Sequence, residues 1–171
     1  LYLDDPDGNG IEVYRDRPDS EWTWSNGEVS MATEPLDGES LLRESDAPWT
    51  GMPAGTLIGH IHLHVSELQQ TETFYTRGLG VDIVNRYGGA LFTSYGGYHH
   101  HIGLNTWNGV GAPRPKKNSV GLNWYSLVFP DEAARQQTVE NLRSIGADAA
   151  QHGDIYVTAD PSGNGIHLTV G

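Results

Sequence analysis

Metal-binding side chains stand at matching places in two copies of one short sequence. Residues 5–13 read DPDGNGIEV, and residues 160–168 read DPSGNGIHL. Each copy follows an apolar run, and its Pro and Gly residues precede a second apolar run, so each predicts a strand, a turn and a strand. The copies differ at Glu12 and His167, and both residue types are metal ligands. The repeat predicts a chain of 171 residues built from duplicated modules, the first present only as its end.

Histidines form a second chemical signal. His60, His62 and His64 alternate with apolar residues, which predicts a strand with three imidazoles on one face. A run of three more, 99–101, comes before another apolar stretch. The chain has no cysteine, so a metal must be held by His, Asp or Glu. The alternative is that these histidines are ordinary polar residues of a strand and a solvated loop.

The charge balance excludes some classes of partner. The chain carries 22 acidic and 10 basic residues, a net charge of −12, and its lysines are Lys116 and Lys117. Such a surface repels nucleic acid and anionic membranes. The scarcity of lysine favours a salt-adapted source over an ordinary acidic protein. No apolar run reaches membrane-spanning length and no signal peptide opens the chain, so we expect a cytoplasmic location.

The order of expected elements defines the fold class. A capping box at Ser66 and Gln69 starts a helix that Gly78 stops, and Asp131 caps a second helix that runs to Ser144. Strands are expected at 59–65, 81–86, 90–94, 102–106, 122–129, near 149, at 155–158 and at 166–170. The order strand–helix–strand–strand–strand therefore occurs twice and predicts an α+β fold.

Three segments follow from this order. Residues 1–17 read as the C-terminal strands of a preceding βαβββ module. Residues 18–57 read as a linker with one short helix at 36–43, because they lack clear periodicity. Residues 58–171 read as one domain made of two βαβββ modules. The orphan strands of residues 1–17 would expose a sheet edge, so we expect them to pair with a missing N-terminal domain or a second copy of the chain.

The sequence resembles the vicinal-oxygen-chelate superfamily, which includes glyoxalase I, bleomycin-resistance proteins and type I extradiol dioxygenases. The resemblance rests on GHIHLHVS at 59–66, Phe74-Tyr75, GLG at 78–80, and GYHHHIGLNTW at 97–107. It implies paired βαβββ modules whose mixed sheet curves into a cup. The two-domain catechol 2,3-dioxygenases are the most similar group. They use Fe(II), with Mn(II) or another divalent metal as the alternative, to cleave small aromatic diols with O₂.

Tyr2, Asp5, Pro6, Gly8 and Glu12 match the run that ends the catalytic domain of extradiol dioxygenases. The resemblance implies that Glu12 is the carboxylate ligand and that Tyr2 forms a hydrogen bond on the substrate side. Two imidazoles and one carboxylate leave iron positions open for catecholate and O₂. The two histidine ligands would then lie upstream of the first residue.

The resemblance also implies roles for histidines of the second domain. His60 and His167 occupy metal-ligand positions, but Trp124 aligns opposite His60, and tryptophan cannot bind a metal. His100 matches an acid–base residue that takes and returns a catechol proton. His101 is the alternative metal ligand, and alternation does not choose between the two.

Two functions from different classes follow. The chain is the C-terminal part of an Fe(II)-dependent extradiol ring-cleavage dioxygenase of aromatic catabolism, or it is a non-catalytic ligand-binding or structural module of the glyoxalase/bleomycin-resistance fold. Trp124 at a ligand position favours the second. A glyoxalase- or isomerase-like metal enzyme is a weaker third reading, because it would need carboxylates where this domain has histidines.

Overall fold

A computed structural model describes residues 1–116 and 118–171, and it divides the chain into two compact units, Leu1–Ile58 and Gly59–Gly171. The first unit contains β1 (Tyr2–Asp4), β2 (Gly10–Glu12), the 3₁₀ turn η1 (Asp19–Glu21), β3 (Trp24–Ser25), β4 (Glu28–Val29) and α1 (Gly38–Leu42). The second contains β5 (Ile61–His64), α2 (Leu68–Thr73), the π-helical η2 (Phe74–Leu79), β6 (Asp82–Tyr87), β7 (Ala90–Ser94), β8 (Ile102–Asn105), β9 (Tyr125–Phe129), α3 (Glu132–Ser144), β10 (Ala150–His152), β11 (Ile155–Ala159) and β12 (Gly165–Val170).

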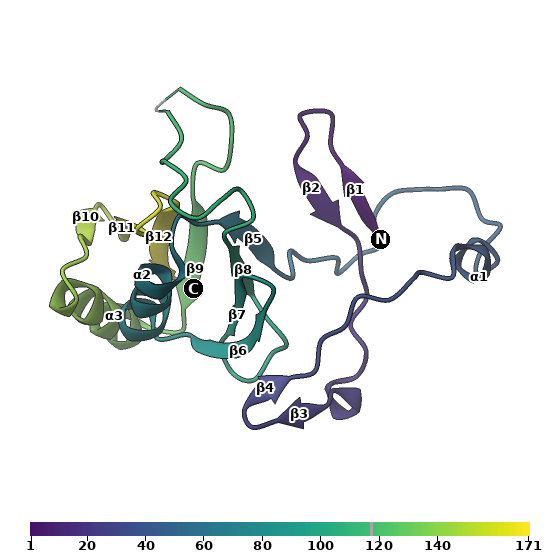
Figure 1. The fold of residues 1–171 in the computed structure, drawn as a ribbon, viewed down its shortest axis with the longest axis horizontal. Coiled ribbons are helices and arrows are strands. Elements are labelled where there is room, and N and C mark those ends of the chain that lie inside the picture. Colours follow the sequence, from purple (N-terminus) through teal and green to yellow (C-terminus); the bar gives the residue numbers. More distant parts are fainter. Residues whose placement is uncertain (117) are drawn as a thin grey trace. The chain divides into compact units, whose positions relative to one another are not determined.

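The first unit consists of two antiparallel hairpins and a short helix (Figure 1). The expected helix at 36–43 is present as α1, whose N-terminus is capped by the Asp37 side chain accepting from the Ser40 N–H. The β3–β4 hairpin was not expected. Asn26 and Gly27 both have positive φ, 53° and 83°, which is the usual pair for a two-residue hairpin turn. The Asn-Gly pair itself favours a hairpin, but strands of two residues are too short to show alternation in the sequence.

The described residues of the second unit form two four-stranded mixed sheets, with strand orders β5-β8-β7-β6 and β9-β12-β11-β10. In each sheet the first and last strands of a module pair in parallel, and the other pairs are antiparallel. Ile61 pairs with Ile102 in one sheet, and Tyr125 pairs with Ile166 in the other. This arrangement confirms the α+β class and the paired βαβββ modules.

The helices of the two modules join them through one apolar core. η2 continues directly from α2 and packs against α3, and α2 and α3 both contact the sheets (Figure 1). The buried cluster draws residues from both modules, including Leu63, Leu79, Leu142 and Ile166. Gly78 permits the close approach of η2 to α3, because a Cβ there would lie 2.7 Å from Leu142 Cδ2.

Two expected helix boundaries need correction. Glu67, not Ser66, caps α2 by accepting from the Gln69 and Gln70 N–H groups. Ser66 instead donates its backbone N–H to Ser162 Oγ, a contact between the modules. The helical segment ends at Gly80, in the left-handed region at φ 80°, rather than at Gly78.

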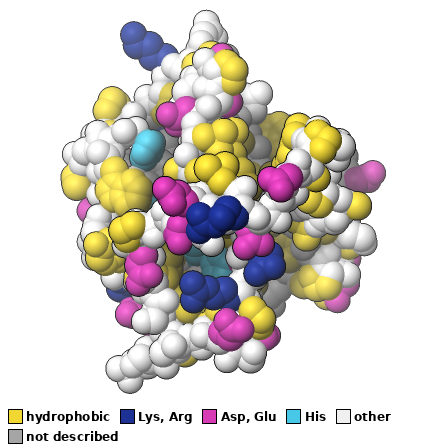
Figure 2. Space-filling model, turned by 90° about the vertical axis from the view of Figure 1, so that its right-hand side faces the viewer, with side chains coloured by type: hydrophobic (Ala, Val, Ile, Leu, Met, Phe, Trp, Pro, Cys, Tyr) yellow, Lys and Arg dark blue, Asp and Glu magenta, His cyan; other side chains and the backbone are white. Residues whose placement is uncertain are grey.

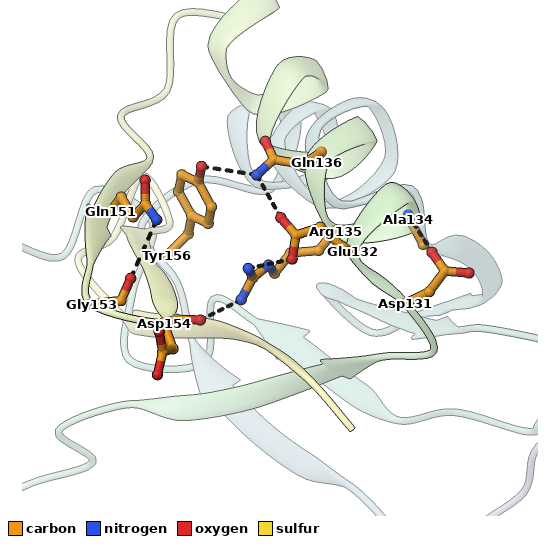
Figure 3. Close-up of polar contacts among 9 residues, drawn as sticks. All are labelled: Asp131, Glu132, Ala134, Arg135, Gln136, Gln151, Gly153, Asp154 and Tyr156. Atoms are coloured by element: carbon orange, nitrogen blue, oxygen red, sulfur yellow. Dashed lines mark hydrogen bonds and ion pairs between the residues drawn. The ribbon is translucent and has the colours of Figure 1, made fainter.

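Polar contacts attach α3 to the β10–β11 hairpin (Figure 3). The Asp131 carboxylate caps α3 by accepting from the Ala134 N–H, as expected. Buried Arg135 donates to the Asp154 carbonyl and pairs with Glu132, while Gln136 donates to the Tyr156 hydroxyl. Asp131, Glu132 and Asp154 therefore serve helix capping and packing.

The surface is mixed in character. On the face drawn in Figure 2, acidic side chains lie scattered among hydrophobic ones rather than in one patch. Of the helices formed by residues 1–116 and 118–171, none has the length and apolar character needed to cross a membrane.

Candidate functional site

The β1–β2 hairpin brings the two predicted residues of the first unit together. Tyr2 and Glu12 are direct partners across the antiparallel pair, so their side chains lie on one face. The Tyr2 hydroxyl donates a hydrogen bond to the Glu12 carboxylate. Tyr2 is exposed, but desolvation of its hydroxyl, followed by the charge and hydrogen bond of Glu12, raises the pKa of Tyr2, so the phenol stays protonated at neutral pH.

Imidazoles gather on the sheet face of the first module in the second unit. The His60 and His100 rings lie 4.3 Å apart between centroids, and Phe92 packs edge-on against His100 at 5.1 Å. His62 lies 5.8 Å from the Phe92 ring and 5.1 Å from the Trp107 ring. The predicted alternation of β5 is confirmed, because His62 and His64 are exposed whereas Leu63 is buried.

His100 is the most strongly perturbed of these groups. It is buried, and the nitrogen atoms His99 Nδ1 and His100 Nδ1 lie 2.9 Å apart in a hydrogen bond. Burial, and next the neighbouring His60, His99, His62 and His101, lower the pKa of His100 to about 3. The His100 ring is therefore neutral at neutral pH.

His101 lies in different surroundings from His100. Its Nδ1 is 3.2 Å from Ser94 Oγ and accepts from the Tyr95 N–H at 3.3 Å, and its ring lies 4.6 Å from the Tyr98 ring. Because a backbone N–H donates to Nδ1, the neutral tautomer with the proton on Nε2 fits this position. Burial and His99 lower the pKa of His101, in agreement with a neutral ring.

The strand registers show which positions of the two modules are equivalent. Since Ile61 pairs with Ile102 and Tyr125 pairs with Ile166, His60 corresponds to Trp124 and Gly103 corresponds to His167. Trp124 and His167 stack, with centroids 4.3 Å apart and planes 16° apart. The second module therefore has a stacked Trp124–His167 pair at the positions where the first module has His60 and Gly103.

The donor set of the second unit does not fit a centre with two histidines and one carboxylate. Across residues 1–116 and 118–171, no three His, Asp or Glu side chains converge in an arrangement able to hold a metal ion. Trp124 occupies one of the equivalent positions, and the buried Asp160 carboxylate accepts hydrogen bonds from the Tyr75 hydroxyl and the Asn164 amide. Among the described residues, His60, His101 and His167 are therefore not brought together in one such centre.

Two residues of the histidine cluster, His62 and His99, stood out in the sequence but had no role assigned to them. His99 bonds to His100, and His62 covers Gly103, where a Cβ would lie 2.6 Å from His62 Cδ2. The signal for His62 was the glycine directly opposite it in β8, because only glycine leaves room for the ring.

Comparison with known proteins identifies the family. Residues 57–168 match the model of the Glyoxalase/Bleomycin resistance protein/Dioxygenase superfamily. The chain belongs to this superfamily. The vicinal-oxygen-chelate resemblance is therefore confirmed, and with it the interpretation of each sheet as one module of that fold.

Individual relatives agree with this assignment. Catechol-2,3-dioxygenase from Bacillus subtilis (strain 168) is 45% identical over 173 residues, which cover 99% of this chain and 60% of that protein. The chain thus spans about three fifths of the length of that relative. Two solved structures share the fold. Lactoylglutathione lyase from Agrobacterium tumefaciens matches with a TM-score of 0.51 and 19% identity, over 70% of this chain and 96% of that protein. Glyoxalase I from Leishmania major matches with a TM-score of 0.54 and 18% identity, over 68% of this chain and 87% of that protein.

Proposed function

We propose that this chain is part of an Fe(II)-dependent extradiol dioxygenase that cleaves the ring of a catechol-type substrate with O₂. Glu12 is the carboxylate ligand of the iron, and Tyr2 lies beside it. The observation that carries the proposal is the Tyr2–Glu12 pair, which is joined by a hydrogen bond and framed by a defined turn. The whole-chain similarity to a catechol-2,3-dioxygenase supports it.

The residues of this chain have limited and specific tasks in that reaction. Iron, when bound, supplies the site at which both catechol oxygens and O₂ are activated. Glu12 contributes one negative charge to the ligand set, and the Tyr2 hydroxyl, by donating to that carboxylate, fixes its orientation. Because its pKa is raised, Tyr2 acts as a hydrogen-bond donor and not as a base.

We propose that the remaining ligands come from a strand and helix that cover the β1–β2 hairpin. Leu1, Leu3, Ile11 and Val13 are 40–59% exposed. Their counterparts in the second copy, Tyr156, Thr158, Ile166 and Leu168, are at most 7% exposed beneath α3 and beside β9. A preceding domain or a second copy of this chain would supply the missing cover.

The test uses the longest natural polypeptide that contains this chain. The protein is loaded with Fe(II) without oxygen and then given a series of catechols and O₂, while O₂ uptake and loss of the catechol are followed together. We expect stoichiometric ring cleavage, and a loss in Glu12→Gln exceeding the roughly 10–100-fold typical of outer-shell changes. Glu28→Gln, an exposed acid of the same unit, is the matched control. No cleavage of any catechol would refute the proposal.

A second function rests on the Trp124–His167 stack. Trp124 is 52% exposed and occupies a position equivalent to a metal ligand. Its indole stacks on the His167 imidazole. An aromatic surface of this kind suits a non-catalytic module that binds a flat ligand. If added Fe(II) or Mn(II) leaves the melting temperature of the second unit unchanged, the result favours this function. A clear rise in that melting temperature would oppose it.

A further inference from the structure

The turn that precedes Glu12 is held by a closed set of local hydrogen bonds. Asp5 Oδ1 accepts from the backbone N–H groups of Asp7 and Asn9, at 2.9 and 2.8 Å. Asp5 Oδ2 accepts from Asn9 Nδ2 at 2.8 Å. Between backbones, Asp5 donates to Asn9 and Gly8 donates to Asp5. The Asn9 side chain thus closes the turn from the side of β2.

The second copy repeats this set. Asp160 Oδ1 accepts from the Ser162 and Asn164 N–H groups at 2.9 Å each, and Asp160 Oδ2 accepts from Asn164 Nδ2 at 2.8 Å. The two backbone bonds recur as well. Asp5 and Asn9 lie in an exposed hairpin, whereas Asp160 is 1% exposed. The same geometry in such different surroundings indicates that the sequence of the turn sets it.

We propose that Asn9 is a positioning residue for the Tyr2–Glu12 pair: by closing on Asp5, its amide fixes the register in which β1 meets β2. This inference rests on the proposed function. With Asp4 opposite Gly10, the register runs through Leu3 and Ile11 to place Tyr2 opposite Glu12. A slip of one residue would turn every following side chain to the other face of the strand, and Glu12 would leave Tyr2.

The two copies differ in what else supports the turn. β12 is held on both sides, by β11 and by β9, and Asp160 also accepts from the Tyr75 hydroxyl. Among the described residues, β2 pairs with β1 alone, and the contacts of Asp5 are confined to its own turn. Loss of the asparagine amide should therefore disturb the register in the first copy and leave it intact in the second.

Asn9→Ala and the matched control Asn164→Ala test this difference in the longest natural polypeptide that contains the chain. The first readout needs no metal: a nuclear Overhauser contact between the Tyr2 ring and the Glu12 side chain. We expect this contact to be lost in Asn9→Ala and kept in Asn164→Ala. The second readout is the dissociation constant for Fe(II) alone, added without oxygen, which we expect to rise about 10–100-fold in Asn9→Ala only.

The reciprocal exchange Asp5→Asn with Asn9→Asp serves as rescue, because it restores one amide–carboxylate bond across the turn. We expect it to recover the ring contact and most of the Fe(II) affinity. An Asn9→Ala protein that keeps both the ring contact and wild-type affinity overturns the inference. If the wild-type protein binds no Fe(II), the proposed function fails, and the ring contact alone decides whether Asn9 positions the pair.

Discussion

The buried carboxylate of Asp160 provides the sharpest test of the packing between the modules. It accepts from the Ser162 and Asn164 backbones, from Asn164 Nδ2, and from the Tyr75 hydroxyl at 3.2 Å. Tyr75 is fully buried and its hydroxyl lies 3.1 Å from that of Tyr125. Burial, then Tyr125 and Asp160, raise the pKa of Tyr75 well above its usual value, so this hydroxyl is a permanent donor.

Asp160→Asn replaces one acceptor oxygen with an NH₂ group. If the amide oxygen keeps the two backbone bonds, the NH₂ faces Asn164 Nδ2, and two donors meet in a buried place. A buried donor without an acceptor costs about 1–3 kcal/mol. We expect the free energy of unfolding to fall by about that amount, and the melting temperature to fall by about 2–4 °C per kcal/mol.

Asp5→Asn is the matched control, because it changes the same bonds in an exposed turn where water replaces a lost partner. Chemical and thermal denaturation of both variants, followed by circular dichroism, would measure the difference. A loss of less than about 0.5 kcal/mol in Asp160→Asn, or equal losses in the two variants, would refute the reasoning.

Three further changes have defined outcomes. Gly78→Ala places a Cβ 2.7 Å from Leu142 Cδ2 and 3.0 Å from Ile145 Cδ1, so overpacking should cost about 1–3 kcal/mol in denaturation, and a neutral result would contradict the close helix contact. His100 has a folded-state pKa of about 3 against an ordinary value of 6.5, so the unfolded state binds more protons between these values and stability should fall as pH drops from 6.5 toward 3. His100→Gln should flatten that dependence in denaturation at several pH values; an unchanged slope would exclude His100 as its source. With a net charge of −12, the free energy of unfolding should rise between 0.1 and 1 M KCl as screening weakens self-repulsion, whereas a fall would contradict salt adaptation.

The order of elements in the second unit was predictable because each carries a local signal. The alternation of His60 to Val65 marks β5, Asp131 marks the start of α3, and the repeated turn marks the β11–β12 hairpin. One error in this unit arose from a contact between residues far apart in the sequence. Ser66 looked like a helix cap, but its backbone bonds to Ser162, 96 residues away.

The candidate site was harder to predict for the same reason. The Tyr2–Glu12 pairing follows from one short turn and is visible in the sequence. The contact between His60 and His100 depends on the path of the loop before β8, which no periodicity describes. The low pKa of His100 depends on burial within that cluster, which the sequence motif does not reveal.

The most direct measurement is the Fe(II) content of the longest natural polypeptide that contains this chain, after anaerobic loading and removal of free metal, for Glu12→Gln and His167→Ala beside the wild type. These residues hold equivalent places in the duplicated turn, but Glu12 accepts from Tyr2 whereas His167 stacks on Trp124. The account predicts stoichiometric iron in the wild type and in His167→Ala, and its loss in Glu12→Gln. Iron retained by Glu12→Gln, or lost from His167→Ala, would contradict the claim that Glu12 is the ligand.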